Sequence, residues 1–446
     1  MENNNSQFSV KKLFRGASIY SVGEILVKAS GFFLIPIYTR VLTPSDYGVV
    51  GYLQVILQIF TVVLAFGFHG AQSRYYYDVD KDLQQLGRFS FSINISQIIL
   101  FMLIAVPVSI IGFKYSITVG KSKILFYPFV LLTIWTALLQ VLANNAVGYY
   151  RASQQFTRAA ILQLLRFIFI TGFSLYFVLN KELGALGRVF GLFLGMFVFI
   201  IISFWNYTRV FVFQFSFEDL KYALGFGTPL VIHLLAGTIH TAIDRVILER
   251  YVSMGELGIY SLAFNIGNVL NMFIISFNQA YQPTFFDLMS SERTDKKSQI
   301  IKIFSVWLWL LTIIVLAAIL IGPYFLKIFA GENFVSVIEV FPFMIISFFF
   351  GGFYYFFATP LFYYKKTKLL PIITIISSTV NIILNILFIP QFGIIGAAVA
   401  TIISHVVQSL IALILGNRML KIEWPVKHIL SSILLVLSAL AISIVY

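Results

Sequence analysis

The chain alternates between long apolar blocks and short polar turns. The blocks run for about 20 residues or more, which at 1.5 Å per helical residue is enough to cross a ~30 Å hydrocarbon core. Only helices and closed barrels satisfy their backbone hydrogen bonds inside that core. The blocks lack the strict alternation of a barrel strand, so the pattern predicts an all-α polytopic membrane protein.

Twelve transmembrane helices follow from this pattern. They are predicted near 16–39, 48–72, 89–113, 124–148, 159–179, 185–207, 222–248, 257–281, 301–326, 335–361, 369–389 and 394–416. A further apolar segment, 428–446, is predicted to be a thirteenth span, although it could instead lie against the bundle.

The first predicted turn recurs 210 residues later. Its arginine, hydroxyl, acid and glycine are Arg40, Thr43, Asp46 and Gly48, and the later set is Arg250, Ser253, Glu256 and Gly258. Four polar positions of the following helix recur at the same offset, namely Gln58, Thr61, His69 and Gln72 against Asn268, Asn271, Gln279 and Gln282. A glycine-rich turn at 183–187 has its counterpart at 392–396. Such turns recur by chance in polytopic proteins, but three matches in order favour an internal duplication.

The duplication predicts two lobes with the same topology, related by a pseudo-two-fold axis along the membrane normal. The lobes would be a six-helix bundle over 1–210 and a second over 211–417, followed by the extra segment 418–446. The cleft between two such halves is the default place for a substrate.

Composition and charge agree with this architecture. Apolar residues make up 59% of the chain and charged residues 11%, which excludes an ordinary soluble protein. The net charge of +13 is distributed unevenly: with the N-terminus in the cytoplasm, 20 Lys and Arg fall on the inner side and 9 on the outer side. The positive-inside rule therefore predicts a cytoplasmic N-terminus.

The sequence gives no indication of an enzyme. It contains no cysteine, no phosphate-binding P-loop, no GxSxG and no HExxH motif. Every predicted loop is short, so none can hold a catalytic domain. We therefore expect no catalytic residues, no metal site and no cofactor.

Charged residues inside apolar helices are costly, and they indicate either a function or a partner. Glu24 and Lys28 lie one turn apart in the first helix. They form either a self-neutralising structural pair or a site in which Lys28 binds an anion while Glu24 holds it or exchanges a proton. Arg166, three residues after Gln163, faces either a cavity or the cytoplasmic surface by snorkelling.

A polar stripe marks the seventh helix. His233, Gly237, His240 and Asp244 share one helical face, and Asp244 could raise the proton affinity of His240. In the alternative interpretation, Asp244 and Arg245 lie at the outer membrane surface. Two histidines without further acidic ligands make a weak metal site.

Two further features have structural interpretations. Asn381 and Asn385 share a face of the eleventh helix, where interhelical hydrogen bonding is expected. The aromatic run 348–357 is interpreted as lipid-facing or interfacial packing, with stacking against sugar rings or a polyprenyl chain as the alternative.

At this point the chain resembles a known family, the bacterial oligosaccharide flippases of the polysaccharide transporter family, which include O-antigen flippases. They share a superfamily, MOP, with multidrug and toxin extruders and the lipid II flippase. The resemblance rests on Pro36, Tyr38, Arg40, Thr43, Pro44, Asp46, Tyr47 and Gly48, and on Gly227, Pro229, Asp244, Arg245, Gly258, Tyr260, Ser261 and Ala263. It extends over the twelve predicted helices. The single segment after the twelfth helix departs from the family, whose extra helices usually come in pairs.

The resemblance implies a two-lobed bundle around a V-shaped central cavity in the bacterial cytoplasmic membrane. Undecaprenyl-diphosphate-linked oligosaccharide repeat units would cross from the inner to the outer leaflet by alternating access, for O-antigen, capsule or exopolysaccharide assembly. H⁺ or Na⁺ antiport, and partnership with a polymerase and chain-length machinery, are further expectations. Cavities of the family tend to be cationic, and Lys28, Arg166 and Arg245 fit that description.

The candidate site residues are thus the cations Lys28, Arg166 and Arg245, with Glu24, His240, Asp244, His233, Gln58, Asn268, Asn381 and Asn385 as coupling or cavity polar groups. A cation-coupled drug extruder and a lipid II flippase are the alternatives within the superfamily. A membrane glycosyl-polymerase is a remote alternative, because the predicted outer loops are too short for one.

Overall fold

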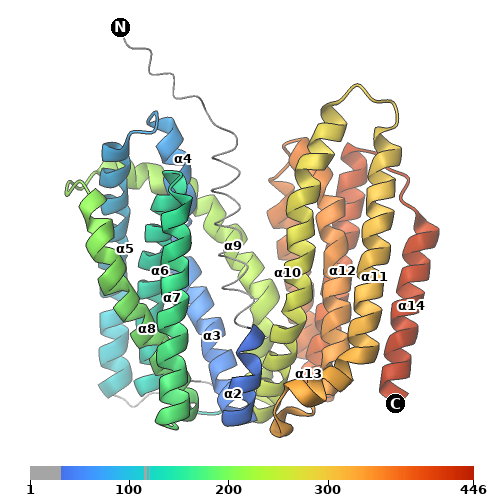
Figure 1. Cartoon of the computed structure of the whole chain (residues 1–446), viewed down its shortest axis with the longest axis horizontal. Coiled ribbons are helices and arrows are strands. Elements are labelled where there is room, and N and C mark those ends of the chain that lie inside the picture. Colours follow the sequence, from blue (N-terminus) through green and yellow to red (C-terminus); the bar gives the residue numbers. More distant parts are fainter. Residues whose placement is uncertain (1–31, 115–117, 120, 446) are drawn as a thin grey trace. The chain divides into compact units, whose positions relative to one another are not determined.

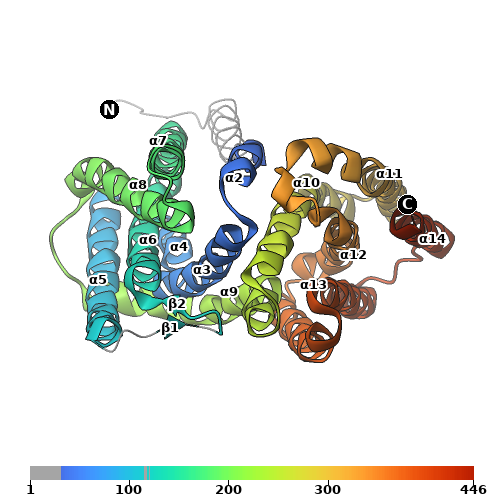
Figure 2. The same cartoon turned by 90° about the horizontal axis from the view of Figure 1, so that it is seen from below.

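The computed structural model describes residues 32–114, 118–119 and 121–445. Within these ranges the chain is helical apart from one antiparallel pair of two-residue strands, β1 (Thr118–Val119) and β2 (Ile124–Leu125) (Figures 1 and 2). The helices of the first half are α2 (Ile35–Val41), α3 (Pro44–Ala65), α4 (Phe68–Asp78), α5 (Leu83–Lys114), α6 (Leu131–Ala152), α7 (Phe156–Leu175) and α8 (Gly184–Tyr207). Those of the second half are α9 (Phe217–Tyr251), α10 (Met254–Ser290), α11 (Lys296–Phe329), α12 (Val337–Tyr363), α13 (Leu369–Met419) and α14 (Val426–Val445). Short π or 3₁₀ turns are η1 (Phe126–Val130), η2 (Tyr176–Asn180), η3 (Thr208–Val210) and η4 (Glu332–Phe334).

The predicted helices that fall within the described residues are present, whereas most of the one near 16–39 lies outside them. Ten helical segments in the described part of the chain are long and apolar enough to cross a membrane. The segments predicted at 369–389 and 394–416 form one element, α13, which is broken at Gly393. Gly393 has φ +55° and ψ −134°, a conformation that glycine adopts far more readily than other residues. The fold class expected from the sequence is confirmed.

The described helices divide into two compact units. The first contains Ile56–Val119 and Lys123–Leu234, and the second contains Leu34–Val55, Gly120–Ser122 and Leu235–Tyr446. The boundaries therefore fall inside α3 and α9, whereas the duplication placed a single boundary at 210/211. The displaced segment, Leu34–Val55, packs with the second unit because its turn contacts that of α10, as described below.

The first unit has a tyrosine-rich core at one end of its bundle. Tyr75 stacks on Phe89 with ring centroids 4.2 Å apart, and Tyr207 is buried beside Tyr149. Asp219, at the start of α9, accepts hydrogen bonds from Tyr75 Oη at 2.8 Å and Arg88 Nε at 2.9 Å. Because Asp219 is only 3% exposed, this pairing is needed to keep a carboxylate there.

Helix α5 of the same unit begins at a capped turn outside the apolar span. The Asp82 carboxylate accepts from the Gln85 side chain at 3.1 Å and from the backbone N–H groups of Gln84 and Gln85. These hydrogen bonds lower the pKa of the Asp82 carboxyl, the Gln85 side chain making the largest contribution. They also satisfy donors that the first turn of a helix leaves open.

The second unit buries the aromatic run of α12. Phe349 and Phe356 are at most 1% exposed, and Trp307 of α11 lies 4.5 Å from Phe356 between ring centroids. Phe357 contacts Trp424, which precedes α14. The expectation that this run faces lipid is wrong for these residues, because α12 lies between α10, α11 and α13.

The two turns of the sequence repeat have the same local structure. Thr43 and Asp46 cap α3 reciprocally, and Ser253 and Glu256 form the same capping box at α10. A Cβ atom added at Gly48 would lie 1.9 Å from the Met254 carbonyl oxygen, and one added at Gly258 would lie 1.9 Å from that of Pro44. The two helix starts therefore contact each other reciprocally through their glycines.

The second repeated turn is also matched. Gly184 and Gly393 have φ values of +53° and +55°. Three residues later, a Cβ added at Gly187 would lie 2.9 Å from the Phe177 carbonyl oxygen, and one at Gly396 would lie 2.5 Å from that of Phe388. In both hairpins glycine is required for the turn and for the close approach of the arms.

Candidate functional site

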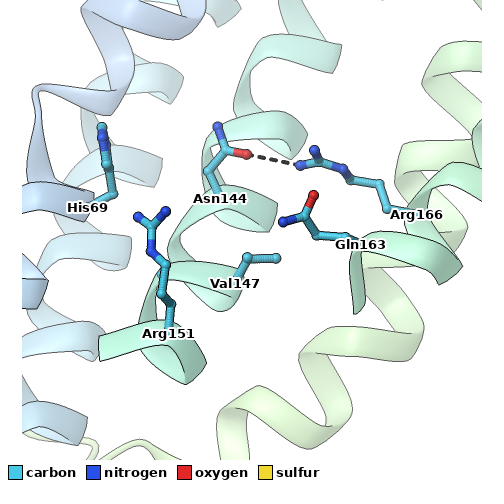
Figure 3. A pocket seen from close by; sticks show the side chains of 7 residues that line it. His69, Asn144, Val147, Arg151, Gln163 and Arg166 are labelled. Atoms are coloured by element: carbon cyan, nitrogen blue, oxygen red, sulfur yellow. Dashed lines mark hydrogen bonds between the residues drawn. The ribbon is translucent and has the colours of Figure 1, made fainter. Parts of the chain in front are cut away.

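A polar pocket of about 250 Å³ lies within the first unit (Figure 3). It is lined by His69, Asn144, Val147, Gly148, Arg151, Gln163 and Arg166. Two guanidinium groups, two side-chain amides and an imidazole thus gather on α4, α6 and α7, with Arg166 half-buried and Arg151 exposed. None of the lining residues in the described part of the chain is a carboxylate.

Helical spacing brings these side chains together. Asn144, Val147, Gly148 and Arg151 lie at i, i+3, i+4 and i+7 on α6, so they form one face. Gln163 and Arg166 lie one turn apart on α7, and α4 contributes His69. Figure 3 shows the guanidinium of Arg151 between His69 and Asn144, with Arg166 extending toward Asn144 from α7.

The neighbouring network fixes the rotation of α6. Asn145 donates to the side-chain oxygens of Asn94 at 3.1 Å and Gln97 at 2.6 Å. Gln97 in turn donates to the backbone carbonyl of Leu64. With Asn145 held on the α5 side, the adjacent Asn144 faces the pocket.

The Arg166 side chain is oriented by one of these amides. Its Nη1 donates to Asn144 Oδ1 at 2.9 Å. Gly148 leaves room for the side chain of Gln72, because a Cβ added at this glycine would lie 2.9 Å from Gln72 Oε1. Among the described residues, that oxygen is buried without a hydrogen-bond partner.

This arrangement suits a polyanion with attached hydroxyl groups. Guanidinium groups present planar forks that match phosphate oxygens, and amides both donate to and accept from hydroxyl groups. The described residues contain no group of three or more His, Asp or Glu side chains that could hold a metal ion.

A second polar cluster lies within the second unit. The Asp244 carboxylate accepts a hydrogen bond from Tyr260 on α10 and, at 2.8 Å, from the backbone N–H of Arg245. The Arg245 guanidinium lies 4.1 Å from the centroid of the Phe264 ring, a cation–π contact, and the residue is 6% exposed. Asp244 and Arg245 are therefore buried inside the unit.

His240 does not pair with Asp244. Both of its ring nitrogens lack a hydrogen-bond partner among the described residues. Its ring instead lies 5.1 Å from that of His405 on α13. Asp244 is occupied by Tyr260 because α10 packs beside it, a tertiary contact that helical spacing on α9 could not indicate.

The remaining polar candidates have other positions. Asn385 donates to Asn381 at 2.9 Å, and Asn381 donates to Ser404 at 3.4 Å, so these asparagines join the two arms of α13. Asn268 accepts from Asn271 at 3.0 Å and is half-buried on α10, as is Gln58 on α3. Neither Gln58 nor Asn268 lines the arginine pocket.

Three candidates cannot be placed in this way. Glu24 and Lys28 lie outside the described residues. His233 belongs to α9, but its side chain lies outside the description.

Sequence reasoning found Arg166 and missed its neighbours. Arg151 is one of the 20 Lys and Arg that the charge distribution counts on the inner side, although it ends the same helical face as Asn144. The i, i+3, i+7 spacing of Asn144, Val147 and Arg151 was the available signal. His405 had no such signal, because 165 residues separate it from His240.

Long apolar helices and an arginine-lined pocket define a multi-pass membrane protein of the transporter class. The family model described as "Polysaccharide biosynthesis protein" matches residues 13–289, more than half of the chain. The chain belongs to this family. A second family model, MatE, matches residues 229–387.

Named relatives lie at moderate sequence identity. "Lsg locus putative protein 1" of Haemophilus influenzae is 25% identical over 290 residues, which cover 63% of this chain and 68% of that protein. The "probable low-salt glycan biosynthesis flippase Agl15" of Haloferax volcanii is 23% identical over 396 residues, covering 85% of this chain and 78% of that protein.

Solved structures share the fold. The lipid II flippase MurJ in an inward closed conformation matches with a TM-score of 0.72 at 16% identity, over 96% of this chain and 91% of that one. An inward-facing multidrug-resistance MATE transporter matches with a TM-score of 0.68 at 15% identity, over 88% and 97%. The protein thus has the fold of the MOP superfamily.

Proposed function

We propose that this protein is a flippase that moves a lipid-linked oligosaccharide, carried on a polyprenyl diphosphate, across the cytoplasmic membrane. The observation that carries the proposal is the pocket of the first unit, where Arg151 and Arg166 lie together and none of the described lining residues is a carboxylate. A drug extruder for organic cations would need the opposite charge.

The chemistry of such a substrate fits the side chains present. A diphosphate carries several negative charges, and the half-buried Arg166 attracts it more strongly than an arginine fully in water would, with the exposed Arg151 adding a second positive charge. Asn144 and Gln163 provide donors and acceptors for the first sugar. The Haloferax volcanii relative named as a probable glycan biosynthesis flippase supports the same substrate class.

Further parts of the proposal concern energy and topology. We place the N-terminus in the cytoplasm on the positive-inside distribution. Movement would be driven by H⁺ or Na⁺, or by removal of the glycan at the outer surface by a polymerase. Lys28 and Arg245 remain additional candidates for anion contact.

The test is flipping of a fluorescent undecaprenyl-diphosphate oligosaccharide in proteoliposomes. Arg151→Gln and Arg166→Gln should each slow flipping by at least about tenfold, because each removes a charge-assisted contact of about 1.5–3 kcal/mol. Arg158→Gln is the matched control, since Arg158 is an exposed arginine on α7 that donates to Gln155 outside the pocket.

Two outcomes would contradict the proposal. If all three variants behave alike, the pocket does not bind the substrate. If the wild-type protein moves no lipid-linked sugar with any of several glycans, export of organic cations becomes the function to assay.

A further inference from the structure

Two buried histidines face each other in the second unit with open hydrogen-bonding positions. The rings of His240 on α9 and His405 on α13 have centroids 5.1 Å apart and planes inclined by 68°. Nδ1 and Nε2 of His240 and Nδ1 of His405 are buried without partners among the described residues. Buried polar atoms are nearly always paired, so three unpaired nitrogens at one place point to a ligand.

The packing around the pair is shaped for these rings. A Cβ added at Gly351 of α12 would lie 3.5 Å from Cγ of His405, so the glycine lets the imidazole lie against the helix. The centroid of the Phe348 ring lies 6.4 Å from that of His405 and 5.6 Å from that of Phe264. Phe264 carries the Arg245 guanidinium on its face.

The charged and titratable groups near the pair are few. Among the described side chains, helix α9 contributes Asp244 and Arg245, and α10 contributes Tyr260. Helix α12 has Tyr354 and Tyr355 one turn beyond Gly351, and its one charged residue is Glu339 in the first turn. The first arm of α13 carries no charge, and the second carries Arg418 at its end.

These surroundings favour a proton over a metal ion as the ligand. First-row metals in proteins take three or four protein ligands, and the described residues hold no third His, Asp or Glu that could complete such a site. A neutral imidazole already carries one N–H, so a single added proton turns the lone-pair nitrogen of one ring into a second donor, which a lone-pair nitrogen of the other ring can accept. A second proton would place two positive charges side by side near Arg245.

We propose that His240 and His405 form a proton-binding pair that takes up one proton between α9 and α13. The proton adds to a lone pair of one imidazole nitrogen, and the other ring accepts the new N–H. Binding would draw the two helices together, and the added charge would act on Arg245 through the Phe348 and Phe264 contacts. That the pair binds a proton does not depend on the proposed function. That it couples transport to H⁺ rests on the proposed function.

The proton site is tested without any substrate. The chain has five histidines, so a His69→Gln/His233→Gln/His428→Gln variant leaves only the pair. In this variant, ¹⁵N NMR of labelled imidazoles from pH 5 to 8 should show both rings titrating together with one midpoint. Adding His405→Gln should move the midpoint of His240 by at least about one pH unit, because interacting sites titrate as a pair.

Three results would overturn the pair. The rings could stay neutral across the whole range, titrate independently, or bind Zn²⁺ at micromolar concentration with loss of the neutral signals. If the triple variant does not fold, the wild-type spectrum with all five histidines is compared with spectra of single variants. That comparison also shows whether His240 and His405 titrate together.

Coupling is tested separately in proteoliposomes. For one proton per cycle, a gradient of one pH unit should enrich the lipid-linked sugar up to about tenfold in the receiving leaflet. His240→Gln and His405→Gln should abolish this enrichment while equilibration at equal pH continues, and His428→Gln, which changes an exposed residue, should keep it. If no flipping is seen under any condition, the proposed function is wrong, but the NMR result on the proton site still holds. If enrichment persists in both the His240→Gln and His405→Gln variants, the coupling proposal is wrong.

Discussion

Asn144 shows how one uncharged side chain can set the geometry of a cationic pocket. Its Oδ1 accepts from Arg166 at 2.9 Å, and its neighbour Asn145 is held by Asn94 and Gln97. The amide therefore orients the guanidinium and adds no negative charge of its own to the pocket, as a carboxylate would.

Substitution of Asn144 should separate orientation from charge. Asn144→Leu removes the acceptor and should slow flipping about fivefold or more, in line with a lost bond to a charged group. Asn144→Asp keeps an acceptor for Arg166 but adds a negative charge, so it should raise the substrate concentration needed for half-maximal rate more than Asn144→Leu does. Initial rates across substrate concentrations measure both effects, and equal behaviour of the two variants would refute the orienting role.

Single residues also show where sequence reasoning stops. Arg166 could be recognised because its charge is out of place in an apolar run. Arg151 could not, because a charge at the end of a helix looks the same whether it faces water or a pocket. The partner of Asp244 proved to be Tyr260, which lies on another helix.

Among the helices, α13 illustrates the use of glycine at a sharp turn. Its arms are joined by the Asn381–Ser404 hydrogen bond, with the positive-φ residue Gly393 about midway between the two residues. The sequence located this turn correctly from its resemblance to the one at 183–187. The helices predicted at 369–389 and 394–416 are the two arms on either side of Gly393.

Replacement of Gly393 should therefore be costly. Gly393→Ala forces a side chain into the left-handed region and should lower the free energy of unfolding by about 1–3 kcal/mol. The matched control is Gly237→Ala on α9, where an added Cβ meets nothing within 4 Å and helix propensity predicts a gain of about 0.5–1 kcal/mol. Thermal melting of the purified protein in detergent compares them, and equal melting temperatures would contradict the strain argument.

Across the full chain, the apolar blocks and the charge distribution predicted the membrane class and the helical fold. They could not reveal that Leu34–Val55 packs with the second unit, because that depends on the close contact between two distant glycines. The boundary at 210/211 was inferred from the sequence repeat, whereas the two compact units are defined by contacts between residues.

The charge distribution makes a direct prediction about topology. A reporter fused after Arg418 should be cytoplasmic, and one fused after the final residue should be external, because α14 has 20 residues and is about 30 Å long. Paired phosphatase and fluorescent-protein fusions give opposite signals on the two sides. An external signal after Arg418 would reverse the orientation, and a cytoplasmic signal at both positions would mean that α14 does not span.

The reciprocal contact of Gly48 and Gly258 also sets an order of assembly. The turn at Pro44 leaves the ribosome first, but the Met254 carbonyl that it packs against is made about 200 residues later. At ~5–20 residues per second, translation takes about 10–40 s to reach it. During that interval the first hairpin is in the membrane without its partner, so the second unit completes its packing only after a late segment returns to the earliest one.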